Sequence, residues 1–307
     1  MSHPLNTAYK FDLPTLRDTR YSNAYNREFL FTDNDFNRIK YLIALLVGIS
    51  LTSAKKDMVY VRLSRRLRAL NFTTFNEYLN YAEHNMLELE QFTNSLTTNL
   101  TAFFREYHHF PILQKQLQSI KSRPIRLWCA AASTGEEAYS MAISAAEILG
   151  LEQCKNRISI IASDVDTSVL KIAKKGIYQR EHITKIAELN SDEILKKYFL
   201  YSNKNNNIVS VKPELKQLIT FKQINLLDNH WTALNNAKFD AIFCRNVMIY
   251  FTKELQLKIL RHLVEVMQPN GLLFVGHSEN FLNASDILIS QGKTVYKLKN
   301  NKIENNK

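Results

Sequence analysis

The 307-residue sequence predicts an α/β fold in its carboxy-terminal part, preceded by a small all-α domain. After Pro124, short apolar runs alternate with helix-like stretches, a pattern typical of βαβ units and of a parallel sheet covered by helices. Before it, residues 34–98 show helical spacing and contain almost no glycine or proline. Two structural regions are therefore expected to follow one another along the chain.

Bulk composition limits the classes of protein to which the chain can belong. A hydrophobic content of 45% suits a globular core, and the longest apolar run, residues 41–51, is too short to span a bilayer. The amino terminus lacks the basic start and apolar stretch of a secretory signal. Three cysteines without metal-ligand spacing favour free thiols in a reducing cytoplasm. These features predict a cytoplasmic protein, and we expect a monomer.

The first region carries a local excess of positive charge. In KKDMVYVRLSRRLRAL, residues 55–70, the apolar side chains recur on one helical face. Arg62 and Arg65 point away from that face, and Arg66 lies at its flank. The arginines form either a solvated face or a docking surface for an acidic partner, which includes nucleic acid, anionic lipid and acidic protein.

The second region contains five apolar runs that predict the strands of the sheet. They are IRLWCAA (125–131), RISIIASD (157–164), ITFKQINL (219–226), FDAIFCR (239–245) and GLLFVGH (271–277). Residues 286–298 predict two more strands around a turn at Gly292. A small β-hairpin with an Asn-rich turn is expected at about 198–216, inserted within the larger domain.

Small residues follow the first predicted strand and lead into a helix. Residues 130–135, AAASTG, allow a ligand to approach the backbone at a helix amino terminus. Glu136 and Glu137 crowd the start of this helix, so they disfavour a pyrophosphate and suit a ligand with cationic and hydroxyl groups. A glycine turn with helix-capping acids explains the same residues equally well.

Polar residues at three further strand ends suggest a binding site along one edge of the sheet. Asp164 suits the two hydroxyls of a ribose, although Asp164 or Asp166 also suits the cap of the next helix. Asn225 has a side chain able to recognise an adenine edge, but asparagine is common at strand ends. Arg245, Asn246 and Tyr250 are expected at the same rim, where an ordinary strand end is the alternative.

The segment TTNLTAFFREYHHF, residues 97–110, is dense in polar and aromatic side chains. It suits either a segment that closes over a pocket or an amphipathic helix with threonine caps. Other chemistries fit the chain poorly. His108 and His109 lack a matching ligand cluster for zinc, and neither a nucleophile elbow nor a GxxxxGK[ST] phosphate loop is present. No metal site is therefore expected.

Together, these segments resemble the chemotaxis receptor methyltransferases of the CheR family. The resemblance covers residues 36–298 in the family's order and rests on KDMVYVRLSRRLRAL, TTNLTAFFREYHHF, AAASTGEEAYS, ASDVDTSVLKIAKKGIY, FDAIFCRNVMIYF and GLLFVGHSENF. It implies a Rossmann-like S-adenosylmethionine-dependent methyltransferase domain with an inserted β-hairpin subdomain, behind a small all-α domain. The expected divisions are a flexible arm at 1–30, the helical domain at 31–98, a cofactor-edge linker at 99–123, the catalytic domain at 124–298 and a disordered tail at 299–307.

The resemblance implies an activity and partners. Such an enzyme transfers methyl from S-adenosylmethionine to glutamate side chains in the cytoplasmic domain of chemotaxis receptors, giving methyl esters and S-adenosylhomocysteine. Arg62, Arg65 and Arg66 become the expected receptor-docking residues. The β insert of some members also binds a receptor carboxy-terminal peptide, but the corresponding turn here, residues 202–207, lacks the family's glycine, so tethering stays open. Neither nucleic acid nor direct membrane insertion is expected.

The resemblance also assigns site residues. Arg105 and Tyr250 are expected to be catalytic, with Tyr250 near the transferred methyl and Arg105 also touching the cofactor. The expected cofactor contacts are Asn99, Thr101, Arg105, Glu136 in the pocket wall, Asp164 at the ribose, Asn225 and Leu226 at the adenine, and Arg245 and Asn246 beside the methionyl part. The sequence does not decide whether Arg105, Arg245 or neither orients the substrate carboxylate.

The expected mechanism needs no general base, because a glutamate side chain is ionised at neutral pH. Its oxygen attacks the methyl carbon of the sulfonium in line, aided by alignment and by exclusion of water. Three rival hypotheses fit less well. A nucleic-acid methyltransferase suits the net charge of +11 but lacks an [ND]PPY-type motif. A nicotinamide oxidoreductase lacks GxGxxG, and a non-enzymatic receptor-binding protein would not need every cofactor motif.

Overall fold

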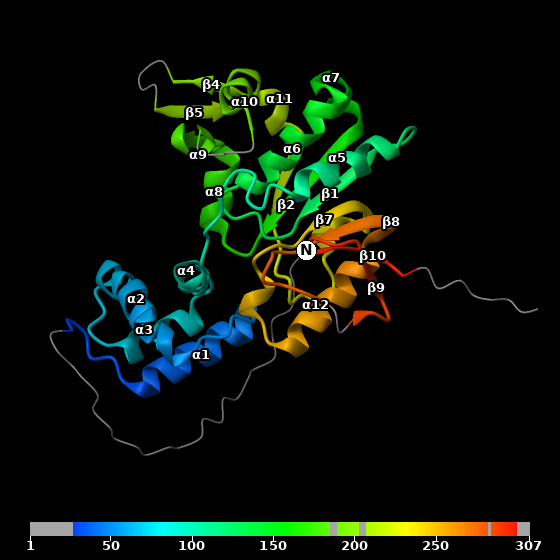
Figure 1. The fold of residues 1–307 in the computed structure, drawn as a ribbon. Coiled ribbons are helices and arrows are strands. Elements are labelled where there is room, and N and C mark those ends of the chain that lie inside the picture. Colours follow the sequence, from blue (N-terminus) through cyan, green and yellow to red (C-terminus); the bar gives the residue numbers. More distant parts are fainter. Residues whose placement is uncertain (1–26, 185–188, 203–206, 282–283, 300–307) are drawn as a thin grey trace, which may run out of the picture.

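The computed structural model describes residues 27–184, 189–202, 207–281 and 284–299. Most of the expected flexible arm, the tail beyond residue 299 and the centre of the Asn-rich turn lie outside these residues. Within them, a helical domain adjoins a seven-stranded sheet flanked by helices, which confirms the predicted fold class. In Figure 1, helices α1 to α3 gather on one side of the molecule, and α4 lies between them and the sheet domain.

The helical domain is built from amphipathic helices around one apolar core. The helices are α1 (Asp33–Val47), α2 (Lys56–Leu70), α3 (Phe75–His84) and α4 (Met86–Leu96), with the 3-10 turn η1 (Ser53–Lys55) before α2. Thr32 and Asp35 form a capping box that starts α1, and Gly48 ends it at a φ of 74°. The predicted apolar face of α2 is buried in this core through Val59, Leu63 and Leu67.

The large sheet has the strand order β6-β2-β1-β7-β8-β10-β9. Its strands are β1 (Ile125–Cys129), β2 (Ile158–Asp164), β6 (Ile219–Gln223), β7 (Phe239–Phe243), β8 (Met267–Phe274), β9 (Leu288–Ser290) and β10 (Val295–Leu298). The first five positions of this order run parallel, and β10 is antiparallel to both of its neighbours. All seven strands lie where the apolar runs predicted them.

Helices cover both faces of the sheet, so its strands are apolar on both sides. Leu127 and Cys129 of β1 face a core shared with α5 (His109–Ser119) and α6 (Glu136–Leu149), whereas Trp128 faces a core shared with α12 (Lys253–Glu265). The other helices and turns are α7 (Leu151–Arg157), α8 (Thr167–Lys175), α9 (Glu181–Thr184), α10 (Ser191–Tyr198), α11 (Pro213–Lys216), η2 (Thr232–Leu234) and η3 (Met248–Tyr250).

The insert is larger than the expected hairpin. Strands β4 (Phe199–Tyr201) and β5 (Ile208–Val211) form that hairpin, and β3 (Ile177–Gln179) pairs with the other edge of β5. The result is a three-stranded antiparallel sheet of order β3-β5-β4. Strand β3 is separated from the hairpin by α9 and α10, so its pairing with β5 is a tertiary contact that the local pattern does not predict. No helix among the described residues combines the length and apolarity needed to cross a membrane.

Candidate active site

A pocket opens where the carboxyl ends of β1, β2, β6 and β7 meet the helical domain. It holds about 1190 Å³ of space not filled by protein, including space open to solvent. Ligands of doubly wound sheets bind at this edge, where the loops after the strands converge. Nine residues expected in the site line it, namely Asn99, Thr101, Arg105, Asp164, Asn225, Leu226, Arg245, Asn246 and Tyr250.

Glu136, the remaining expected cofactor residue, does not line this pocket. It accepts a hydrogen bond from Thr134 Oγ1 at 2.6 Å and lines a separate shallow hollow beside Tyr178. Its neighbour Glu137 lines the main pocket instead. Successive residues of a helix point about 100° apart, so only one of two adjacent glutamates faces a given wall. The sequence offered no signal to distinguish them.

Asp164 and Asp166 have separate roles at the end of β2. Asp166 caps α8 by accepting from the backbone N–H groups of Ser168 and Val169. Asp164 lines the pocket and accepts from the backbone N–H of Ser133 at 2.8 Å and of Asp166 at 3.0 Å. Burial raises the pKa of Asp164 to about 6, although these two N–H groups oppose the shift.

The segment that carries Asn99 is tied to this same strand end. Asp166 Oδ2 accepts from Thr97 Oγ1 at 2.7 Å and from Asn99 Nδ2 at 2.8 Å. Ser133 Oγ donates to the carbonyl of Asn99 at 2.9 Å, and Ser133 has a φ of 48°. A positive φ at a residue other than glycine is typical of strained backbone at functional sites. The linker between the domains is therefore held as a wall of the pocket.

The side chain of Asn225 is occupied by the protein itself. Its Nδ2 donates to the carbonyl of Leu46 at 2.7 Å, and its Oδ1 accepts from the backbone N–H of Leu227 at 3.0 Å. The amide thus anchors the pocket wall to the end of α1. These bonds use one N–H and one lone pair of the amide, so adenine contact by Asn225 stays a prediction. The sequence gave no sign of a partner so distant along the chain.

Arg245 lies fully buried at the tip of β7, and its charge is shared by two carboxylates. Its Nη1 donates to Glu137 at 2.8 Å, and its Nη2 lies 3.3 Å from Glu106 and donates to the carbonyl of Arg105. Burial raises the pKa of Glu137, and Arg245 opposes this shift. With both terminal nitrogens engaged, Arg245 is a fixed wall of the pocket, whereas Arg105 remains partly exposed.

Glu106 connects this charge cluster to the next strand end. Its Oε1 accepts from Asn246 Nδ2 at 3.2 Å and contacts His277 Nδ1 at 3.0 Å. Burial alone would raise the pKa of Glu106, but hydrogen bonds from His277 and Asn246 and the charge of Arg245 outweigh it, and the pKa falls to about 2. Glu106 and Asn246 have φ values of 54° and 57°, so their backbones are strained toward this arrangement.

Glu279 is a site residue that the sequence analysis missed. Its buried carboxylate accepts from the backbone N–H groups of Asn246 (2.8 Å), Met248 (2.7 Å), Ile249 (3.4 Å) and Gly276 (2.6 Å). It therefore holds the loop that carries Asn246 and Tyr250. A Cβ on Gly276 would meet Asn246 Nδ2 at 2.4 Å, so the glycine permits this close approach. That glycine near the end of a predicted strand was the available signal.

Tyr250 lies in η3 and is half-buried at the pocket. Its carbonyl accepts a hydrogen bond of 2.9 Å from the backbone N–H of Ser50, and Ser50 belongs to the loop after α1. The helical domain thus contacts both the pocket wall that carries Asn225 and the loop of Tyr250. Residues of both domains are needed to close the pocket.

The three expected docking arginines differ in their availability. Arg62 donates through Nη1 to the carbonyls of Leu96 (3.2 Å) and Thr97 (2.6 Å) at the end of α4. Arg66 pairs with the buried Glu88, with Nη2 2.6 Å from Oε2. Arg65 is exposed and has no hydrogen bond or ion pair within the described part of the chain. The sequence pattern could not separate these three environments.

Comparison with known proteins gives close matches over nearly the whole chain. Residues 99–297 match the family model described as CheR methyltransferase, SAM binding domain, and residues 34–97 match CheR methyltransferase, all-alpha domain. The chemotaxis protein methyltransferase 2 of Pseudomonas aeruginosa is 46% identical over 276 residues, covering 88% of this chain and 95% of that protein. The chemotaxis protein methyltransferase of Escherichia coli is 46% identical over 270 residues, covering 87% and 91%.

Similarity to solved structures is weaker. The rRNA methyltransferase aviRa from Streptomyces viridochromogenes has a TM-score of 0.39 and 16% identity over 65% of this chain and 85% of that one. A TM-score below 0.5 establishes neither the fold nor the function of this chain.

Proposed function

Because the chain belongs to the CheR family of chemotaxis methyltransferases, we propose that its pocket holds S-adenosylmethionine with the sulfonium methyl beside Tyr250. The chain is an S-adenosylmethionine-dependent protein-glutamate O-methyltransferase of chemotaxis receptors. It produces glutamate methyl esters and S-adenosylhomocysteine. The observation that carries the placement of the cofactor is the convergence of nine expected residues on one pocket.

The charges of the pocket suit this cofactor. Asp164, at the end of β2, is in position to accept hydrogen bonds from the ribose hydroxyls. Glu137 also lines the pocket, where Arg245 pairs with it, and Lys55 and Arg105 are the other charged side chains of the lining. The carboxylates of Glu137 and Asp164 attract the sulfonium and ammonium groups of this cofactor, and the cationic side chains suit its carboxylate. Glu137 takes the place at the wall that the sequence assigned to Glu136.

The reaction forms one bond and breaks one. An ionised oxygen of the receptor glutamate bonds to the methyl carbon while the carbon–sulfur bond breaks, and its electron pair returns to sulfur to give neutral S-adenosylhomocysteine. We assign orientation of the substrate carboxylate to Arg105 rather than Arg245. Arg105 is partly exposed and uses Nη1 to donate to the carbonyl of Leu100 at 2.9 Å, which leaves guanidinium donors free for a carboxylate.

Receptor contacts extend beyond the pocket. Arg65 is the docking arginine that we favour, because its side chain is exposed and unengaged among the described residues. The three-stranded insert leaves β3 and β4 with one free edge each within the described residues, and such an edge can add a peptide strand. We propose that the reaction takes place in the cytoplasm, on the receptor's cytoplasmic domain.

Transfer of radiolabelled methyl from S-adenosylmethionine to a receptor cytoplasmic fragment tests the function. Mild alkali should then release the label as volatile methanol, because the product is an ester. Arg105→Ala should lower kcat/KM for the receptor about tenfold or more, with S-adenosylhomocysteine affinity reduced far less. Alkali-stable label would overturn the glutamate assignment, and equal losses of both quantities would overturn the role of Arg105.

A further inference from the structure

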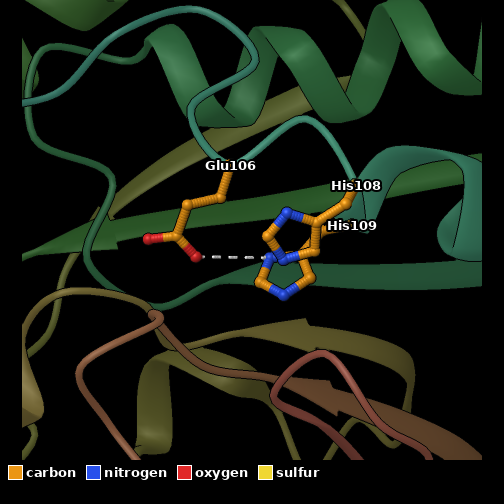
Figure 2. Close-up of side chains that lie close together, drawn as sticks. All are labelled: Glu106, His108 and His109. Carbon is orange, nitrogen blue, oxygen red and sulfur yellow. Dashed lines mark ion pairs between the residues drawn. The ribbon is translucent and has the colours of Figure 1, made fainter.

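Three potential metal ligands meet behind the pocket, in the segment that leads into α5 (Figure 2). One ligand atom each from Glu106, His108 and His109 lies within 4.8 Å of the others. The sequence analysis saw two adjacent histidines without a partner. The positive φ of Glu106 turns its carboxylate back toward them, which a sequence pattern does not reveal.

A second observation shows that this cluster is incomplete. The side chain of His109 is fully buried, yet its Nδ1 has no hydrogen-bond partner. Its Nε2 lies 2.7 Å from the carbonyl of Lys293, which can only accept, so Nε2 carries the proton. In the neutral ring Nδ1 then presents a lone pair.

The nearest group that faces this lone pair is also an acceptor. Glu106 Oε2 lies 3.8 Å from Nδ1 and is itself without a hydrogen bond. Figure 2 marks this pair of atoms with a dashed line, and no hydrogen bond joins them. Metal-binding histidines show the same arrangement, with the second ring nitrogen held by a carbonyl.

We propose that Glu106, His108 and His109 bind a divalent transition-metal ion of the zinc class, with solvent completing its coordination. Imidazole and carboxylate ligands select such an ion over magnesium or calcium, which prefer oxygen alone. Ligand atoms about 2.0–2.2 Å from a tetrahedral zinc lie roughly 3.3 Å apart. The 3.8 Å gap between Glu106 and His109 is close to this value, so the partly exposed His108 makes the main adjustment.

Arg245 limits the affinity of the metal site and couples it to the cofactor pocket. Its Nη2 lies 3.3 Å from the same Oε2, so an ion and the guanidinium compete for one carboxylate. Arg245 would keep its bonds to Glu137 and to the carbonyl of Arg105. Because Arg245 lines the pocket, the ion should weaken cofactor binding, and the cofactor should weaken ion binding by the same factor. This coupling rests on the proposed function, whereas the site itself does not.

The test uses the full chain without a polyhistidine tag, stripped of metal by a chelator. Zn²⁺ is titrated by calorimetry, and Co²⁺ by its visible absorption. One ion per chain is expected, with affinity at least tenfold lower in His108→Ala. His108 has no side-chain hydrogen bond within the described chain, so this variant should fold. His84→Ala, which alters an exposed histidine of α3, should bind as the unaltered chain does. Absence of binding, or equal binding by His108→Ala, would overturn the site.

A second measurement isolates the coupling. The dissociation constant of S-adenosylhomocysteine is determined with and without saturating Zn²⁺. It should rise with Zn²⁺ in the unaltered chain and in His84→Ala, but not in His108→Ala. An unchanged value in all three chains would overturn the coupling. Failure of methyl transfer would contradict the proposed function and leave the metal titration as an independent result.

Discussion

At the scale of single residues, environment decides what a carboxylate does. Asp164 faces the pocket and accepts hydrogen bonds from two backbone N–H groups. The carboxylate of Asp166, two positions later, caps α8 and binds the side chain of Asn99 in the linker. Glu136 and Glu137 are adjacent, yet only Glu137 reaches Arg245. Glu279 accepts from four backbone N–H groups. The chemistry of each side chain follows from the groups that the fold brings to it.

The raised pKa of Asp164 predicts a pH dependence of cofactor binding. Burial raises this pKa to about 6, with the charge of Asp166 adding to the shift and the N–H groups of Asp166 and Ser133 opposing it. Below that pH the carboxyl is protonated and accepts hydroxyl hydrogen bonds less well. Affinity for S-adenosylhomocysteine should therefore fall as the pH drops from 7.5 to 5, when measured by calorimetry.

Asp164→Asn supplies the control for this titration. The amide does not ionise in this range, so the variant should bind more weakly at pH 7.5 and show a flat profile. A profile that falls equally steeply in Asp164→Asn would assign the titration to another group.

Glu279→Gln should loosen the loop of Asn246 and Tyr250. The substitution replaces one accepting oxygen with an NH₂ group that faces backbone donors, at a cost of about 1–3 kcal/mol. We expect a lower free energy of unfolding in urea together with weaker S-adenosylhomocysteine binding. Glu254→Gln, at an exposed position of α12, should change neither quantity. If Glu279→Gln leaves both the free energy of unfolding and the affinity for S-adenosylhomocysteine unchanged, the loop does not depend on the Glu279 carboxylate for its conformation.

At the scale of elements, α2 supports the pocket as well as presenting a surface. Arg62 places its positive charge on the carbonyls at the end of α4, where a helix carries partial negative charge. The chain leaves α4 directly into the linker that bears Asn99 and Thr101. Arg62 of α2 therefore fixes the point where the linker begins as a wall of the pocket. Among the described residues none pairs with the side chain of Arg65, which is free to bind a partner protein.

This division predicts opposite results for two arginines three positions apart. Arg62→Ala should weaken S-adenosylhomocysteine binding and lower the free energy of unfolding by about 1–3 kcal/mol, because helix carbonyls lose a charged donor. Arg65→Glu should raise KM for the receptor fragment with cofactor affinity intact. Calorimetry and steady-state methylation distinguish the two. A KM effect confined to Arg62→Ala would reverse the assignment.

At the scale of the whole molecule, the pocket belongs to both domains. The end of α1 reaches Asn225 through Leu46, and the loop after α1 reaches Tyr250 through Ser50. Gly48 lies between these contacts at a φ of 74°, and an added Cβ would meet Leu227 at 3.0 Å and Phe251 at 3.1 Å. The junction is therefore closely packed at the point where both domains touch the site.

Gly48→Ala tests this junction against a matched glycine. Gly150 also has a positive φ, 78°, but an added Cβ there would meet nothing within 4 Å. Alanine at Gly48 should lose roughly 1–2 kcal/mol to left-handed backbone strain, and alanine at Gly150, where ψ is 149°, should lose at least as much. Only Gly48→Ala should also weaken S-adenosylhomocysteine binding, because only it displaces pocket walls. Equal cofactor affinity in both variants, measured by calorimetry, would show that the junction does not set the pocket.

Prediction from the sequence succeeded where local pattern determines the structure. Apolar runs located all seven strands of the large sheet, polar strand ends led to five of the pocket residues, and the family resemblance supplied Asn99, Thr101, Arg105 and Leu226. It stopped short where partners lie far apart along the chain. The bond from Asn225 to Leu46 spans 179 positions, and the bond from Arg62 to Thr97 joins two helices. Such contacts form only when distant segments pack together, so the residue types and spacing within one segment do not reveal them.

The strand order has a consequence for synthesis on the ribosome. Strand β1 lies between β2 and β7, and Phe239 of β7 follows Cys129 of β1 by about 110 residues. At roughly 5–20 residues per second, one edge of β1 waits roughly 5–20 s for its neighbour. An unpaired apolar strand is prone to aggregate, so chaperones should act on the nascent chain in this interval. Ser50 meets Tyr250 later still, so the cofactor can stabilise the finished protein but cannot guide the first steps of its folding.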